Sequence, residues 1–102
     1  MKGDSLISPE ILASYAADAA LEVSGVCGLV GSALHRREGV RVTTDEGRLA
    51  VELRVALDWE ASAPAVGAAV QARVGDYLER MADVRPDSVD IVVDEFLPPR
   101  AR

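Results

Sequence analysis

The side chain best suited to nucleophilic chemistry is Cys27, the only cysteine of the chain. A cysteine nucleophile needs a base to activate it, and His35 is the only histidine that could serve. Nothing in their spacing brings these two side chains together, and no catalytic cysteine signature surrounds Cys27. We therefore interpret Cys27 as a small buried apolar group and predict no catalytic residue.

The glycines around this cysteine form a second chemical pattern, because Gly25 and Gly28 make a Gly-x-x-Gly within LEVSGVCGLVGS at residues 21–32. Loops of this type clamp the nucleic-acid backbone in KH-type RNA-binding modules. That role needs basic residues and a position between two helices, whereas valine and cysteine separate these glycines. We interpret Gly25 as the left-handed end of a helix. A KH-like RNA-binding module that uses the Gly25–Gly28 loop is the alternative hypothesis.

Four carboxylates lie close together near the C-terminus, at Asp87, Asp90, Asp94 and Glu95. Carboxylate oxygens bind divalent cations, but Asp90 and Asp94 would be about two residue pairs apart along a strand, which does not form one cage. We interpret all four as charges that keep a sheet edge soluble, with Arg54 as a cross-strand partner of Asp90. The chain has no metal-ligand spacing, nucleotide-binding fingerprint or serine-hydrolase elbow. We therefore predict no metal, cofactor, small-molecule substrate or enzyme activity.

Basic residues concentrate at His35-Arg36-Arg37 and continue at Arg41. This group could dock an acidic partner or an anionic lipid headgroup, and a solvated loop is the alternative interpretation. The whole chain carries a net charge of −6, from 17 acidic residues against 11 basic ones. Because nucleic acids and anionic membranes are bound mainly through lysine and arginine, neither is an expected partner of so acidic a chain.

The composition is that of one globular domain. The chain has 102 residues, of which 49% are hydrophobic and 27% charged, and we predict a single domain over residues 1–102 with a core at about residues 5–97. One cysteine cannot form an internal disulfide, which fits a reducing compartment. No N-terminal apolar run has the length of a signal peptide, and no stretch approaches the roughly 20 apolar residues that span a bilayer. The expected location is cytoplasmic, without direct membrane insertion.

Two helices are predicted from their start signals and apolar stripes. Ser8 can cap free N–H groups and Pro9 suits the first helical position, so a helix is expected from there to about Ser24. Ser62 is the expected cap of a second helix, which ends before Pro86 because proline cannot continue it. The glycine-rich and then charged segment between the first helix and the strands is expected to be a connector.

Three strands are predicted from alternating polarity. Residues 49–59 alternate apolar and mostly polar side chains, with Trp59 last on the apolar face. Residues 40–44 pair with them as an antiparallel hairpin, and residues 88–97 form the third strand. The sequence near residues 26–30 is compatible with either a short strand or a turn. The resulting α-β-β-α-β order predicts an α+β two-layer sandwich, with two helices on one face of a three-stranded mixed sheet.

Several short motifs occur in a recognisable order. They are Ile7-Ser8-Pro9-Glu10-Ile11, Glu22-Val23, Gly25-Val26-Cys27-Gly28-Leu29, Gly39-Val40-Arg41-Val42, Val51-Glu52-Leu53-Arg54-Val55, Ser62-Ala63-Pro64-Ala65-Val66, Val70-Gln71 and Val89-Asp90-Ile91-Val92-Val93. Their order and spacing resemble the bacterial alkaline-shock family, also called the Gls-type general stress or envelope stress response family. The likeness covers about residues 5–95. The chain departs from the family at Glu60, at Ala65 and at residues 84–87, where the family often has a glycine, a glutamate and a shorter turn.

The resemblance implies a non-enzymatic cytoplasmic adaptor that serves cell-envelope homeostasis. Some members lie beneath the membrane, self-associate and are held there by a protein partner that is itself membrane-anchored. An exposed edge strand would suit such contacts, as would a cluster of apolar residues on outward faces. The candidate partner-binding residues are Leu21, Arg36, Arg37, Arg41, Val92 and Phe96. Alternation along residues 88–97 predicts that Val92 and Phe96 share the outward face of Asp90.

Overall fold

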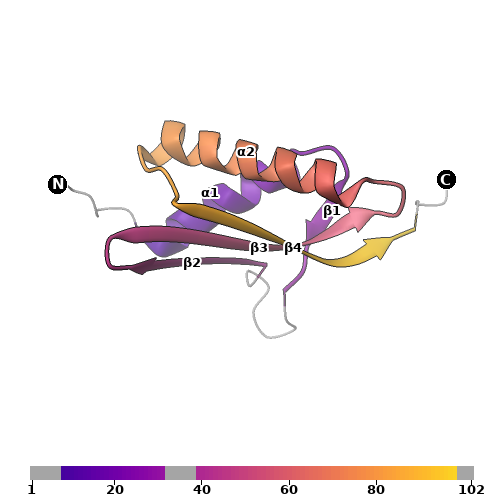
Figure 1. Ribbon diagram of the computed structural model, residues 1–102, viewed down its shortest axis with the longest axis horizontal. Helices are drawn as coiled ribbons and strands as arrows, with labels where there is room; N and C mark the ends of the chain where they lie inside the picture. The colour runs from indigo at the N-terminus through magenta and orange to yellow at the C-terminus, as the bar shows by residue number, and fades with distance from the viewer. Residues whose placement is uncertain (1–7, 32–38, 99–102) are drawn as a thin grey trace.

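The computed structural model describes residues 8–31 and 39–98, which form two helices and four strands. In chain order these elements are α1 (Pro9–Leu21), β1 (Val26–Leu29), β2 (Val40–Asp45), β3 (Arg48–Asp58), α2 (Ala63–Ala82) and β4 (Ser88–Leu97). Both helices lie on the same face of one mixed sheet (Figure 1). The predicted α+β two-layer sandwich is therefore confirmed.

Capping side chains fix where both helices begin. Ser8 Oγ accepts a hydrogen bond from the Ile11 N–H at 3.2 Å, and Ser62 Oγ accepts one from the Ala65 N–H at 3.3 Å. A proline lies in the first turn of each helix. These caps satisfy N–H groups that have no partner within the helix. Both starts agree with the predicted ones, whereas α1 ends at Leu21, earlier than predicted, because the chain turns there to reach β1.

The central strand of the sheet is β3, which has neighbours on both sides. β4 pairs with it in parallel, and β1 and β2 both pair with it antiparallel on the other side. β2 lies along the first half of β3 and β1 along the second half. Arg54 marks the junction, because its carbonyl accepts from the Val30 N–H at 2.9 Å and its N–H donates to the Gly39 carbonyl at 2.8 Å. The sheet has one strand more than predicted because β1 continues the line of β2.

The core lies between this sheet and the helix layer. α1 packs on β1 and β2, α2 packs on β4, and the two helices contact each other (Figure 1). Tyr15 and Tyr77 meet edge to face with ring centroids 6.0 Å apart, and Arg73 pairs with Glu22 at 3.1 Å. The buried apolar residues that contact one another are Leu12, Ala16, Ala19, Ala20, Val40, Val51, Leu53, Val55, Leu57, Val66, Val70, Val74 and Leu78.

A β-bulge in β4 changes which face its last residues share. The register with β3 shifts between Val93 and Glu95, after which Phe96 is in register with Leu57. Residues in register across a parallel pair lie on the same face, and Leu57 is a core residue under the helices. The prediction that Phe96 shares the face of Asp90 is therefore wrong. The reason is the extra residue that a bulge inserts, which reverses the alternation beyond it.

Candidate interaction surface

The Gly-x-x-Gly segment shapes the backbone between α1 and β1. Gly25 has φ +97°, and a Cβ added to it would lie 2.9 Å from Val66 Cγ2, so both its conformation and its surroundings favour glycine. Its carbonyl accepts from the Asp58 N–H at 2.8 Å. Gly28 lies within β1 in register with Ala56. This segment does not lie between two helices, which is the arrangement that the KH-like alternative required.

Cys27 lies on the surface, so its predicted burial is wrong. The register of β1 against β3 shifts between Val26 and Gly28. This irregularity leaves Cys27 out of the paired positions and turns its side chain toward solvent. Its possible partner His35 lies outside the described residues.

Two of the four predicted carboxylates, Asp87 and Asp94, have separate partners. The Asp87 carboxylate accepts from the Leu49 N–H at 2.6 Å, which ties the start of β4 to β3. Arg54 pairs with Asp94 at 3.2 Å and not with Asp90 as predicted, since the register places Asp90 beside Glu52. Within residues 8–31 and 39–98, no three histidine, cysteine or carboxylate side chains gather as a metal site would require.

The structure separates the residues predicted to bind a partner. Arg41 and Val92 share the uncovered face of the sheet, on either side of β3. Leu21 is 50% exposed at the end of α1, and Phe96 is 48% exposed near the end of β4. Arg36 and Arg37 lie outside the described residues. The four described candidates, Leu21, Arg41, Val92 and Phe96, are each exposed but do not form one surface.

Trp59 is an exposed aromatic residue that the sequence reasoning placed on the apolar face of a strand. β3 ends at Asp58, and Trp59 begins the turn to α2 with 61% of its surface exposed. Its N–H donates to the Leu97 carbonyl at 2.7 Å, which places it beside the end of β4. We call Trp59 and Phe96, both exposed beside this hydrogen bond, the terminal apolar patch. The charged neighbours of Trp59 and the cap at Ser62 were the available signals that the strand stops before it.

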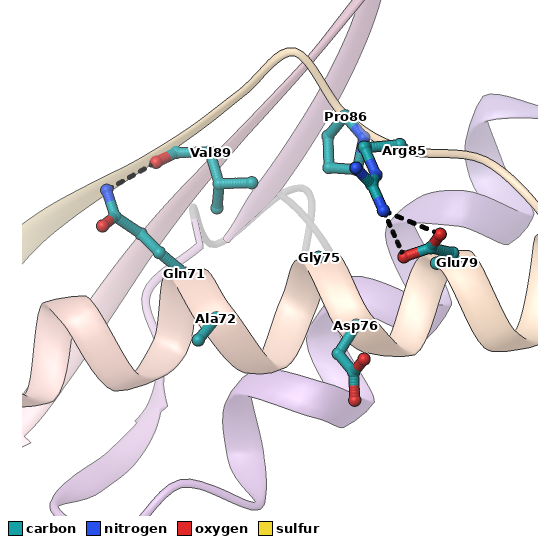
Figure 2. Close-up of a pocket in the computed structure, with 8 residues that line it drawn as sticks. All are labelled: Gln71, Ala72, Gly75, Asp76, Glu79, Arg85, Pro86 and Val89. Carbon is teal, nitrogen blue, oxygen red and sulfur yellow. Dashed lines mark hydrogen bonds and ion pairs between the residues drawn. The ribbon is translucent and has the colours of Figure 1, made fainter.

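A shallow groove runs between α2 and the start of β4 (Figure 2). Gln71 reaches from α2 to the Val89 carbonyl, where its Nε2 donates at 2.8 Å, and Arg85 reaches back to Glu79 at 2.8 Å. We call this space, of about 330 Å³, the α2–β4 groove. Its lining residues are Gln71, Ala72, Gly75, Asp76, Glu79, Arg85, Pro86 and Val89. Four of these side chains are polar or charged, namely Gln71, Asp76, Glu79 and Arg85.

Comparison with protein-family models decides which family these features belong to. Residues 1–97 match the model of the alkaline shock protein 23 family, described as having a cell envelope-related function. The chain belongs to this family. The resemblance predicted from the short motifs is therefore confirmed over nearly the whole length of the alkaline-shock domain. A search of curated protein sequences finds no significant match.

Solved structures share the fold of this alkaline-shock domain. The manganese form of a MamM CTD variant is similar to it, with a TM-score of 0.63 and 21% identity over 84% of this chain and 96% of that one. The cadmium form of another MamM CTD variant has a TM-score of 0.63 and 21% identity, over 86% and 98% of the two chains. A further MamM variant has a TM-score of 0.63 and 20% identity, over 91% and 99%. At these identities the likeness establishes the fold alone.

Within the described ranges, neither helix combines the length and the apolar character needed to cross a bilayer.

Proposed function

We propose that this member of the alkaline-shock family is a non-enzymatic adaptor in cell-envelope homeostasis. It self-associates and docks a membrane-anchored protein from the cytoplasmic side. The cell envelope-related function of the family gives the setting. The observation that carries the adaptor role is the terminal apolar patch, where Trp59 and Phe96 lie 61% and 48% exposed.

Exposed aromatic residues of this kind favour a protein partner. Tryptophan and other large aromatic residues are enriched at the centres of protein interfaces, where their burial contributes much of the binding free energy. The two sheet edges add backbone groups that can pair with another strand, because β2 and β4 each pair only with β3 among the described strands. Aromatic anchors beside a strand edge are what a docking module needs.

The charge of the chain favours a protein over lipid as the link to the membrane. A net charge of −6 opposes direct binding to an anionic bilayer surface. A membrane-anchored protein supplies the link without that repulsion. This argument supports a peripheral position at the inner face of the membrane, reached through a partner.

Replacing Trp59 tests the proposal. In light scattering after size exclusion, W59A should weaken self-association by roughly thirtyfold, the equivalent of about 2 kcal/mol for an interface aromatic residue. Cross-linking in the native host should recover an integral membrane protein with the wild type and little of it with W59A. Ile11 is similarly exposed, at 47%, on the first turn of α1, so I11A is the matched control and should change neither result. A strictly monomeric wild type that captures no membrane protein would overturn the proposal.

A further inference from the structure

We infer that β4 accepts an extended basic segment of the partner as an additional strand of the sheet. The inference rests on the proposed adaptor function and names the chemistry of the segment that docks. It follows from three properties of β4: its open backbone edge, the incomplete cover of its helix-side residues, and its acidic opposite face.

The backbone edge of β4 is the first property. β4 has 10 residues and, in the described part of the chain, its only neighbouring strand is β3. About half of the N–H and C=O groups of such an edge strand point away from the sheet and can pair with an added strand. Gln71 already covers the Val89 carbonyl at 2.8 Å, so the accessible edge lies beyond that residue, toward Leu97.

Incomplete burial on the helix side is the second property. Val89, Ile91 and Val93 of β4 face the core but remain partly exposed, whereas Val51 and Val55 of β3 are 1% and 0% exposed. The α2–β4 groove adjoins Val89 and leaves about 330 Å³ beside this row. A strand added next to β4 would cover the row if its helix-side residues were apolar.

The space in the groove is not taken up by side chains of α2. Gly75 lines the groove, and a Cβ added to it would meet no atom within 4 Å. Ala72 beside it is also small. This flank of α2 therefore has room for side chains that come from outside the chain.

Charge on the open face is the third property. Asp90 lies in register with Glu52, so two carboxylates are neighbours, and the basic residue in register with Glu52, Arg41, lies on its other side, away from Asp90. Glu95, in register with Ala56, adds a third carboxylate to the same face. No basic residue of the described chain forms an ion pair with Asp90 or Glu95, and β4 itself contains no lysine or arginine. Basic side chains on an added strand would neutralise this row.

Together these properties define the partner segment. Successive residues of a strand point to opposite faces, so the segment alternates apolar residues toward α2 with lysine or arginine toward Asp90 and Glu95. Segments on the cytoplasmic side of membrane spans carry an excess of lysine and arginine, which fits a membrane-anchored partner. The β4 edge of a second copy fits poorly, because it would set acidic residues against acidic residues.

Peptide binding tests the inference directly. The probe is a capped synthetic peptide of alternating valine and lysine, matched to the 10 residues of β4. Its control has the same composition with all valines before all lysines. The alternating peptide should shift the amide resonances of β4 and slow their hydrogen exchange, without affecting those of β2. The control should bind about tenfold more weakly, because a strand with all valines before all lysines places both residue types on both faces and cannot match the apolar row and the carboxylates along its whole length.

Two changes separate backbone pairing from charge. N-methylation of alternate peptide residues removes edge-pairing N–H groups while the protein is unaltered, and should reduce affinity by about tenfold or more. The double variant D90N/E95Q should weaken binding by about tenfold at low salt, whereas the charge-matched control D45N/E46Q on the β2 side should not. Equal affinity for the alternating and block peptides, or shifts centred on β2, would overturn the inference.

The outcomes also distinguish this inference from the proposed function. If the membrane protein recovered with the wild type is recovered equally with D90N/E95Q, docking along β4 is wrong and the adaptor role stands. If β4 binds the alternating peptide but no membrane protein is ever recovered, the adaptor role is wrong. Protection of the β4 amides by self-association without peptide would identify a second copy as the occupant and overturn the inference.

Discussion

β3 and β4 carry similar apolar rows on the same face of the sheet, yet the two rows are buried to different degrees. Leu53 in β3 is 0% exposed, whereas Ile91, its partner in register on β4, is only partly buried. β3 has strands on both sides, and β4 has one neighbour among the described strands. The burial of a strand residue therefore depends on the number of neighbouring strands as much as on its own side chain.

Two glycines, one packed against the core and one beside β4, also differ in how closely they are surrounded. A Cβ at Gly25, in the turn that precedes β1, would lie 2.9 Å from Val66 Cγ2. A Cβ at Gly75, on the side of α2 that faces the groove, would have no atom within 4 Å. The interior is packed closely enough to exclude one methyl group, and the β4 flank has unused space. Close packing of the interior and free space beside β4 fit a domain that binds its partner at β4.

The largest expected effect tests this difference in packing. L53A should lower the free energy of unfolding by about 3–4 kcal/mol, because it removes a fully buried side chain and leaves a cavity. I91A should lower it by only about 1–2 kcal/mol, because less apolar surface is lost at a partly exposed site. Urea titration followed by circular dichroism at low protein concentration measures both. Equal losses would mean that β4 is as well covered as β3.

Gly25 gives the next largest effect. G25A should cost about 1–3 kcal/mol, because alanine is strained at φ +97° and its Cβ collides with Val66. G28A is the control from the same Gly-x-x-Gly motif, since its added Cβ meets no atom within 4 Å and should change stability by less than about 0.5 kcal/mol. Similar losses for both variants would contradict the assignment of a special conformation to Gly25 alone.

Much of the fold was predictable because its signals are local. A capping serine and a proline are enough to start each helix, and alternation over β3 is enough to define a strand. The sequence did not decide between a strand and a turn for β1, because β1 has four residues, one of them glycine, and it forms only through its pairing with β3. Pairing between distant segments has no local signal in a single sequence.

The candidate site was predicted less well for the same reason. The exposure of Leu21 and Val92 followed from helical and strand periodicity. The face of Phe96 did not, because the bulge after Val93 depends on the register with β3. Trp59 was missed because its alternation continues that of β3, although the strand ends one residue before it.

Gly75 offers a smaller effect of opposite sign. G75A should raise the free energy of unfolding by about 0.5–1 kcal/mol, because alanine favours the helix and the added Cβ enters open space. Gly67, which also has no atom near an added Cβ, should behave alike and serves as the comparison outside the groove. Thermal unfolding detects the change. If G75A is destabilising while G67A is not, the groove beside Gly75 is already filled.

The smallest effect concerns the ion pair that joins the two strands on the uncovered face. Arg54 and Asp94 lie 3.2 Å apart, but their side chains are 50% and 28% exposed. A double-mutant cycle with R54A and D94A should therefore give a coupling energy below about 1 kcal/mol, which about 1 M salt should abolish. A coupling that is already large and salt-resistant would mean that another part of the chain covers this face of the sheet, which would contradict its description as uncovered.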